Sequence, residues 1–279
     1  MSEENNAKRN RTIWIVVIVV ALLLLCGCAI LAIAGASMMS RSVERLSPQG
    51  IIERVERAQV AGVTVQREEM IEDLETPVRV TISNRVGEVH VMAADGDDLY
   101  VEATIKAWDS PRYSAEETID LVTFNIYEAR DGSDVVIEAG AEEGINWGKS
   151  PVVDLRVYVP QPCQLEVRVD VGEVTLSDIE GVIDVRTNVG QLTVDNLVMV
   201  DDCSLRTDVG EVSVSLPDDA SFSLDASSNV GEVTCQFSLR NERTERQVVK
   251  NRVRGDVGDE PVGELTIRVQ TGAVRVERY

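Results

Sequence analysis

The chain has 279 residues, enough for one large domain or two modest ones, and a formal net charge of -21 at pH 7. This acidic balance argues against nucleic acid as a partner, because the folded body would repel its phosphates. Hydrophobic residues make up 44% of the chain, and many of them are valine. That composition excludes a disordered acidic tail and favours β-strands.

Residues 13–36, IWIVVIVVALLLLCGCAILAIAGA, are almost entirely apolar. A helix of twenty residues spans about 30 Å, so this run is long enough to cross a bilayer as a transmembrane helix. Lys8, Arg9 and Arg11 precede it closely, and fewer basic residues follow it. The asymmetry predicts a single-pass cell-membrane protein, with residues 1–12 in the cytoplasm and the C-terminal domain outside.

Two other interpretations of this apolar segment stay open. Ala34–Ala36 has the small residues of a signal-peptidase site, and Leu25–Cys28 loosely resembles a lipoprotein processing site. The apolar run is longer than a signal-peptide core and continues beyond Cys28. An uncleaved anchor is therefore the favoured interpretation.

Residues 37–76 are rich in charge, contain a Pro-Gln-Gly break and show only patchy helical periodicity. We therefore expect a solvated, partly helical stalk that links the membrane helix to an extracytoplasmic domain over residues 77–279. A coiled coil is the alternative interpretation of this segment, but no heptad pattern is sustained.

From Pro77 onward apolar and polar residues alternate, as in VRVTISNRVGEVHV, which is typical of half-buried strands. One short helix is expected over Ser114–Val122. There the Ser114 hydroxyl and the Glu117 carboxylate form a capping box that satisfies two backbone amides. The segments TFNIYEA and VVIEA, separated by DGSD, predict a hairpin.

A short sequence motif recurs along the second half of the chain. It consists of a strand, then Asn or Asp, Val, Gly, and Glu or Gln in that order, and then a second strand. Four copies have glycines 18, 20 and 21 residues apart, and two looser copies lie outside them. The repeat glycines are Gly87, Gly172, Gly190, Gly210, Gly231 and Gly272. A phrase that recurs at a near-constant interval indicates architecture and not a catalytic loop.

Each copy changes its alternation at the glycine. Apolar residues fall at positions 165, 167, 169 and 171 before Gly172, but at 174 and 176 after it. One extra residue turns the other side of the strand toward the core, and glycine accepts the dihedrals that such a bend requires. Copies stacked about 4.8 Å apart would bury one valine-rich interior. The sequence thus predicts an all-β solenoid or β-roll of repeats about 20 residues long.

Tyr158-Val159-Pro160, followed by repeated [ND]-x-G-[EQ] units with alternating apolar residues, resembles the bacterial β-strand-repeat "putative adhesin" family. This family is a domain of unknown function that often follows a single membrane anchor. The resemblance covers roughly Pro77–Tyr279 and implies a β-solenoid ectodomain, sometimes associated with envelope-stress systems. The family usually has Asp after the glycine, where this chain has Glu or Gln, so no ion site is carried over.

Glu173, Glu211 and Glu232 follow three of the repeat glycines, with Gln191 at the same position in another copy. If the copies stack in register, these side chains form an acidic ladder. Calcium could bridge the carboxylates, since it prefers oxygen ligands. A solvated polar row that discourages aggregation is the favoured alternative, because no Asp-rich calcium loop repeats alongside.

Candidates for catalysis are few. Asp195, Asp201 and Asp202 could mimic the paired carboxylates of a glycosidase, although acids near a turn are usually only exposed. Trp108 and Trp147 could stack on sugars or could cover the end of a core. The chain has a single histidine, which is poor support for a catalytic triad. We expect no catalytic residue and no cofactor.

Three cysteines, Cys163, Cys203 and Cys235, lie outside the apolar segment. An odd number permits at most one intramolecular disulfide, and buried free thiols are the default expectation. No Cys-x-x-Cys or Cys/His cluster indicates a zinc site.

These observations favour a non-catalytic surface or envelope module, held in the membrane by residues 13–36, that presents a repetitive acidic face to an unknown protein or glycan partner. The first alternative is a regulatory ectodomain of an envelope-stress system. The second is a carbohydrate-active enzyme on a β-solenoid.

Overall fold

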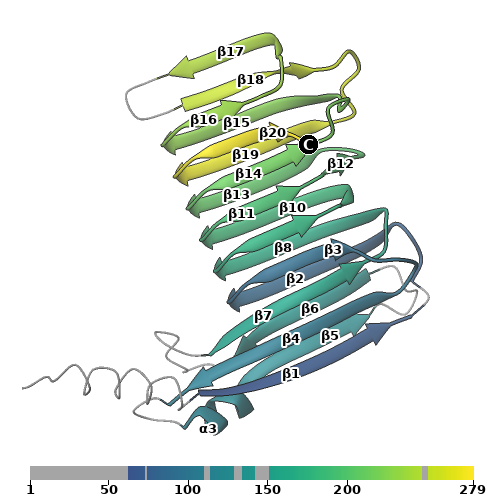
Figure 1. The fold of residues 1–279 in the computed structure, drawn as a ribbon, viewed down its shortest axis with the longest axis vertical. Coiled ribbons are helices and arrows are strands. Elements are labelled where there is room, and N and C mark those ends of the chain that lie inside the picture. The colour runs from purple at the N-terminus through teal and green to yellow at the C-terminus, as the bar shows by residue number, and fades with distance from the viewer. Residues whose placement is uncertain (1–61, 73, 110–113, 129–133, 142–150, 247–250) are drawn as a thin grey trace, which may run out of the picture. The chain divides into compact units, whose positions relative to one another are not determined.

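Two β-sheets account for most of the residues that the computed structural model describes (Figure 1). The described residues are 62–72, 74–109, 114–128, 134–141, 151–246 and 251–279, and all of them fall in one unit, Ala61–Tyr279. The expected cytoplasmic tail and membrane helix, residues 1–12 and 13–36, lie outside this described part. Among the described residues, no helix is both long and apolar enough to span a bilayer.

The nine-stranded sheet consists, in spatial order, of β1 (Gly62–Ile71), β4 (Leu99–Trp108), β7 (Val152–Val159), β3 (Val89–Ala93), β9 (Val174–Ser177), β11 (Leu192–Asp195), β14 (Val212–Leu216), β20 (Val274–Arg278) and β16 (Val233–Cys235). The 11-stranded sheet consists of β17 (Arg240–Arg246), β18 (Asn251–Val257), β15 (Phe222–Val230), β19 (Glu264–Thr271), β13 (Cys203–Val209), β10 (Glu180–Val189), β8 (Cys163–Val171), β2 (Val78–Val86), β6 (Asp134–Ala141) and β5 (Val122–Glu128), with β12 (Val198–Met199) beside β10.

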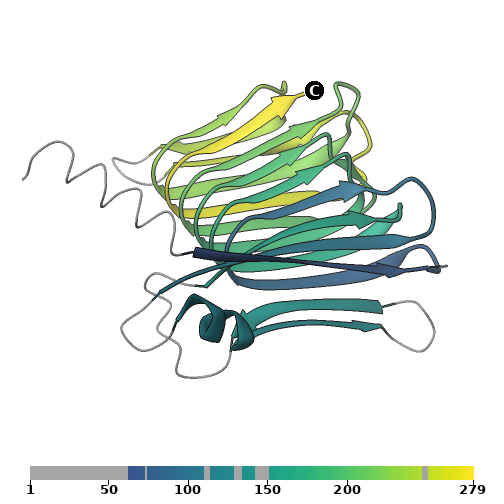
Figure 2. The same cartoon turned by 60° about the horizontal axis from the view of Figure 1, so that its bottom comes forward.

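Each repeat copy contributes one strand to each sheet, and its glycine lies between the two strands. The copies β2/β3, β8/β9, β10/β11, β13/β14, β19/β20 and β15/β16 pair in parallel with the adjacent copies in the stack. Figure 2 brings the bends between the two layers into view. The predicted all-β stack of repeats is confirmed. Strands at its two ends add antiparallel pairs, namely β1 with β4, β4 with β7, β5 with β6, β15 with β18, and β18 with β17.

The spatial order of the copies differs from their order in the sequence. The copy β19/β20 lies between β13/β14 and β15/β16, so these two copies, which are consecutive in the sequence, do not pair with each other. All these copies share one inward apolar pattern. The hydrophobic pattern alone therefore does not determine which of them are neighbours.

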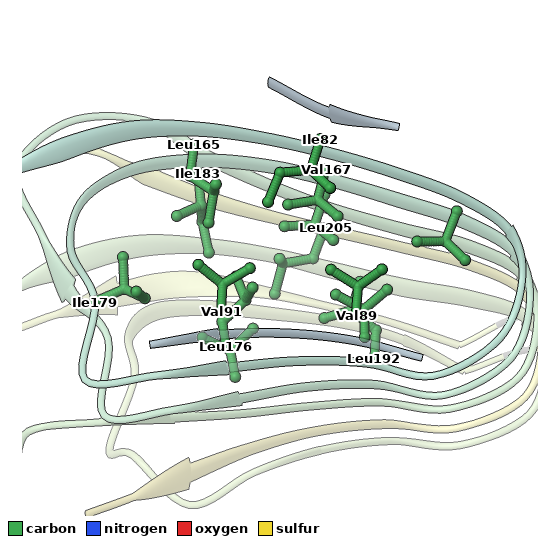
Figure 3. Packing of buried hydrophobic residues seen from close by; sticks show 14 of the residues in the cluster. Ile82, Val89, Val91, Leu165, Val167, Leu176, Ile179, Ile183, Leu192 and Leu205 are labelled. Carbon is green, nitrogen blue, oxygen red and sulfur yellow. The ribbon is translucent and has the colours of Figure 1, made fainter. Parts of the chain in front are cut away.

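The core lies between the two sheets and consists mainly of branched aliphatic side chains. Ile82, Val167 and Leu205 point inward from the 11-stranded sheet toward Val91 and Leu192 of the nine-stranded sheet (Figure 3). All five residues have no exposed surface. Burial of such side chains contributes about 1.5–3 kcal/mol each, which makes this interior the main source of stability.

Part of the expected stalk is a strand. Residues Gly62–Ile71 form β1, which pairs with β4 along its whole length, so the β structure begins at Gly62 and not at Pro77. Val63 and Val65 pack partly against the core. The prediction was wrong here because β1 is an edge strand, where exposed charged residues interrupt the alternation.

The valine before each repeat glycine also differs from expectation. Position 171 was predicted to face inward, yet these valines are about half exposed: Val171 46%, Val189 46%, Val209 50% and Val230 49%. In β8 the inward series ends at Val169, and both Asp170 and Val171 face solvent. The change of side therefore precedes the glycine, and the valine lies on the outside of the bend.

The short helix and the hairpin are confirmed. Helix α3 (Ala115–Asp120) begins after Ser114, whose side chain accepts from the Glu117 amide while the Glu117 carboxylate accepts from the Ser114 amide. It is the single α-helix among the described residues. Strands β5 and β6 form the predicted antiparallel pair.

Candidate functional site

The six repeat glycines form one column at the bends of the stack. Their φ angles lie between 137° and 155°, a region that side chains rarely adopt. A Cβ atom on Gly190 would overlap the carbonyl oxygen of Gly172, and the next glycines in the stack repeat this relationship. The column is structural, because each glycine leaves room for the backbone of the neighbouring copy.

The candidate acidic ladder is interrupted. Backbone hydrogen bonds join the residues after the glycines in the order Glu88, Glu173, Gln191, Glu211, Ala273 and Glu232. Gln191 separates Glu173 from Glu211, and Ala273 separates Glu211 from Glu232. Glu211 also pairs with Arg275. Nowhere in the described part of the chain do three acidic, histidine or cysteine side chains gather in a way that could hold a metal ion.

The other candidates for chemistry that the structure describes have structural roles or separate places in the fold. Asp201 accepts a hydrogen bond from the amide of Asp202, and Asp202 accepts one from the amide of Glu264, at 2.8 and 2.7 Å. Both carboxylates thus hold a turn. Trp108 lies at the end of β4, whereas Trp147 is outside the described residues. These residues were predicted as candidates by type, and those that the structure describes are not gathered at a metal-binding cluster.

The three cysteines are free. Cys163 and Cys203 are buried, and burial raises the pKa of each thiol to about 11. Cys235 is half-buried on the opposite sheet, and burial raises the pKa of its thiol as well. None of the three therefore has the lowered pKa of a reactive cysteine.

Asp225 is the centre of a charged cluster on the 11-stranded sheet. Its carboxylate is 10% exposed and contacts Arg252 at 2.5 Å, Arg268 at 2.6 Å and Arg254 at 3.4 Å. Burial raises the pKa of Asp225, but the hydrogen bonds from Arg252 and Arg268 outweigh it, so the pKa lies well below its ordinary value. The arginines come from β18 and β19, the two strands that flank Asp225 on β15.

A row of arginines crosses the outer face of the same sheet. Arg168, Arg186, Arg206 and Arg268 stand opposite one another on β8, β10, β13 and β19. These four strands are neighbours in the sheet (Figure 1). We call these four residues the arginine row. The row was not predicted from the sequence, although each arginine stands four residues before a repeat glycine. That constant offset is the signal that could have found it.

The two ends of the arginine row form ion pairs, whereas the structure describes none for its two middle residues. Arg168 pairs with Glu166 on its own strand, and Arg268 pairs with Asp225 on the adjacent strand. Arg186 and Arg206 are exposed, and among the described residues no ion pair or side-chain hydrogen bond holds either guanidinium. Two like charges on adjacent strands repel one another, so the fold gains nothing from this placement.

A shallow depression adjoins the first end of the row. It has a volume of about 390 Å³, and its lining includes Ser83, Arg85, Glu138, Gly140 and Arg168. Gly140 carries no side chain, and small residues surround it, which leaves the sheet surface hollow here. The depression and the arginine row form one continuous feature of the outer face, which we take as the candidate functional site.

Comparison with known proteins identifies the repeat. Residues 154–277 match the family model described as Toastrack DUF4097. That stretch resembles a Toastrack DUF4097 domain. The predicted resemblance is confirmed, and all four residues of the arginine row lie within the Toastrack region.

This chain is similar to several solved structures. A "putative cell adhesion protein" from Clostridium sporogenes ATCC 15579 is similar with 13% identity and a TM-score of 0.54, over 77% of this chain and 100% of that one. A "putative adhesin" from Bacteroides fragilis NCTC 9343 is similar with 8% identity and a TM-score of 0.30, over 77% and 97% of the two chains. The first likeness supports the fold alone. No curated protein matches this chain significantly.

Proposed function

We propose that this protein is a membrane-anchored, extracytoplasmic Toastrack module that binds a partner through the outer face of its 11-stranded sheet and catalyses no reaction. The observation that carries the proposal is the register of the repeat. Equivalent residues of adjacent copies stand opposite one another, as Arg186 does with Arg168 and Arg206. A face that repeats the same group once per strand suits a ligand that is itself extended or repetitive.

The placement outside the membrane rests on the sequence. The apolar run 13–36 is long enough to cross a bilayer, and basic residues precede it. The adhesion role named for the Clostridium sporogenes structure fits a surface module of this kind. Adhesion would require the repeat face to be accessible from outside the cell.

The location can be tested on intact cells that produce the full chain with a C-terminal tag. Protease added outside the cells should remove the tag, while a cytoplasmic marker protein survives. A tag that is degraded only after the cells are opened would contradict the extracytoplasmic placement.

The binding face can be tested with a photo-crosslinking amino acid at Asn188, on the outer face of the 11-stranded sheet. A matched variant carries the same group at Thr193, on the outer face of the nine-stranded sheet. Irradiation of cells that naturally produce the protein should give an adduct from position 188 and none from position 193. Adducts at neither position, or only at 193, would contradict the proposed face.

A further inference from the structure

The arginine row is unusual for this chain. The formal net charge is -21, yet four arginines occupy equivalent positions on four adjacent strands. Adjacent strands lie about 4.8 Å apart, so the guanidinium groups are held close together against their mutual repulsion. Structural need accounts for the outer two, which pair with Glu166 and Asp225. It does not account for Arg186 and Arg206.

The chemistry of the exposed pair indicates an anion. Guanidinium is a planar group with five donors that binds carboxylate, sulfate or phosphate through two parallel hydrogen bonds. Two such groups on adjacent strands can engage successive charges of one polymer, which multiplies weak contacts. The Ser204 hydroxyl, two residues before Arg206 on the same face, also has no hydrogen-bond partner among the described residues.

The residues on both sides of the row restrict the shape of the ligand. Two residues before the arginines, on the same face, stand Glu166 and Asp184, and two residues after them stand Asp170 and Asp208. These acidic side chains lie about 6.6 Å along the strand from the arginines. A broad anionic surface, such as a bilayer or a nucleic-acid duplex, would meet them and be repelled. A single narrow chain that runs across the strands would not.

The same flanking groups favour a polymer that carries hydroxyl groups. The carboxylates of Asp184 and Asp208 only accept hydrogen bonds, and sugar hydroxyls can donate to them. Asn188 and Gln270, on the same side as Asp208, add amide groups that both donate and accept. An acidic peptide would instead place its own carboxylates against these acids.

We propose that the arginine row binds a single linear anionic glycan, whose sugar units carry carboxylate or sulfate groups, with Arg186 and Arg206 as the principal contacts. The glycan would lie across β8, β10, β13 and β19, and would reach the depression beside Arg168. This inference deepens the proposed function, on which it rests, by naming the chemical class of the partner.

Binding can be measured with the full chain purified in detergent and immobilised through a C-terminal tag. Polygalacturonate supplies carboxylates and dextran sulfate supplies sulfates, while neutral dextran and polyglutamate serve as matched polymers. One or both of the anionic glycans should bind, more weakly as salt is raised, because these contacts are exposed. The stronger of the two then distinguishes a carboxylated from a sulfated ligand.

The double variant Arg186→Ala/Arg206→Ala should weaken that binding on the order of tenfold, since each arginine makes charge-assisted hydrogen bonds. The control Arg156→Ala/Arg275→Ala removes two positive charges from the nine-stranded sheet and should bind like the wild type. The variant Arg186→Lys/Arg206→Lys keeps the positive charges but loses the two parallel hydrogen bonds that each guanidinium can make. Its affinity for the glycan should lie between those of the wild type and the alanine variant. Unchanged circular dichroism of the alanine variant would show that it is folded.

Four outcomes would overturn the inference: no binding of either anionic glycan, equal binding of neutral dextran, equal binding of polyglutamate, or equal weakening in the control. A protein adduct at position 188 without glycan binding would contradict the inference of a glycan ligand but would agree with the proposed function. A tag protected from external protease, with glycan binding intact, would contradict the proposed extracytoplasmic function but would agree with a glycan ligand.

Discussion

A Cβ atom on Gly272 would overlap the carbonyl oxygen of Gly210, although the whole copy β15/β16 lies between them in the sequence. The same relationship joins Gly231 to Gly272 on the other side. Backbone hydrogen bonds confirm this order, since the Gly210 amide donates to Thr271 and the Gly272 amide donates to Val230. The contacts between the repeat glycines therefore show which copies are neighbours in the stack.

Replacing Gly190 with alanine should destabilise the fold strongly. Its φ is 150°, and the new Cβ would overlap the carbonyl of Gly172. A strained residue costs about 1–3 kcal/mol, and moving backbone in the middle of the stack adds to that. Urea unfolding followed by circular dichroism should therefore show a loss of more than about 2 kcal/mol.

Gly96→Ala is the control for this substitution. Gly96 has a φ of 118°, but no atom lies within 4 Å of its Cβ position. The Gly96→Ala variant therefore reports the cost of the backbone conformation alone, and it should lose less stability than Gly190→Ala. Equal losses would mean that the close approach of the copies contributes nothing.

Asp225→Asn should destabilise the protein at neutral pH by about 2 kcal/mol, because Arg252 and Arg268 lose a largely buried carboxylate partner. The pKa of Asp225 in the folded state lies below the value of about 3.9 expected in the unfolded chain. The carboxylate therefore stabilises the fold above about pH 4, and this contribution fades as the pH falls further.

Urea titrations at a series of pH values, with wild type and variant side by side, measure the effect. The difference between the two proteins should be constant near neutrality and should shrink below about pH 4. A difference that stays the same down to pH 3 would contradict the assigned role of Asp225.

The three cysteines should differ in reactivity toward iodoacetamide. At pH 8 a thiol with a pKa of about 11 is only about one-thousandth thiolate, and Cys163 and Cys203 are also buried. Cys235 is more accessible and should be labelled first in the native protein. Mass spectrometry of the peptides measures this, with urea-unfolded protein as the reference in which all three react. A peptide linked through Cys203 and Cys235 would disprove the free thiols.

Ser114→Ala should weaken helix α3 by about 1 kcal/mol, because the capping hydroxyl that accepts from the Glu117 amide is lost. Ser114→Asp should retain the cap, since a carboxylate accepts the same hydrogen bond. Hydrogen exchange at the Glu117 amide reports this directly. Similar exchange rates in the alanine variant and the wild type would show that packing alone holds the helix.

The unit of the fold was predictable from sequence because its cause is local. Alternation and the glycine phrase specify strand, bend and strand, as at Gly172 and Gly190. The order of the copies depends on contacts between segments far apart in the chain. Asp225 shows this, since its arginine partners come from β18 and β19, and no local pattern couples those strands to β15.

The candidate site was less accessible to sequence reasoning. Outward positions carry no packing signal, so the predicted candidates were acidic residues, which are abundant in this strongly acidic chain. Glu211 and Glu232 looked adjacent because their copies are consecutive, but the inserted Ala273 separates them. Arg186 and Arg206 recur at a fixed offset from glycine. Their functional interest appears only once the register places them side by side and no described residue forms an ion pair with either.

The position of β19 and β20 between copies that precede them in the sequence has a consequence for how the protein is made. Ribosomes release this chain from its amino end, so β15 and β16 emerge before the strands that must separate them from β13 and β14. Until β19 and β20 have been synthesised, β15 and β16 have no parallel strand with which to pair. A premature stop codon just before Glu264 would therefore open a gap in the interior of the domain, whereas in an ordinary repeat array it would only shorten one end.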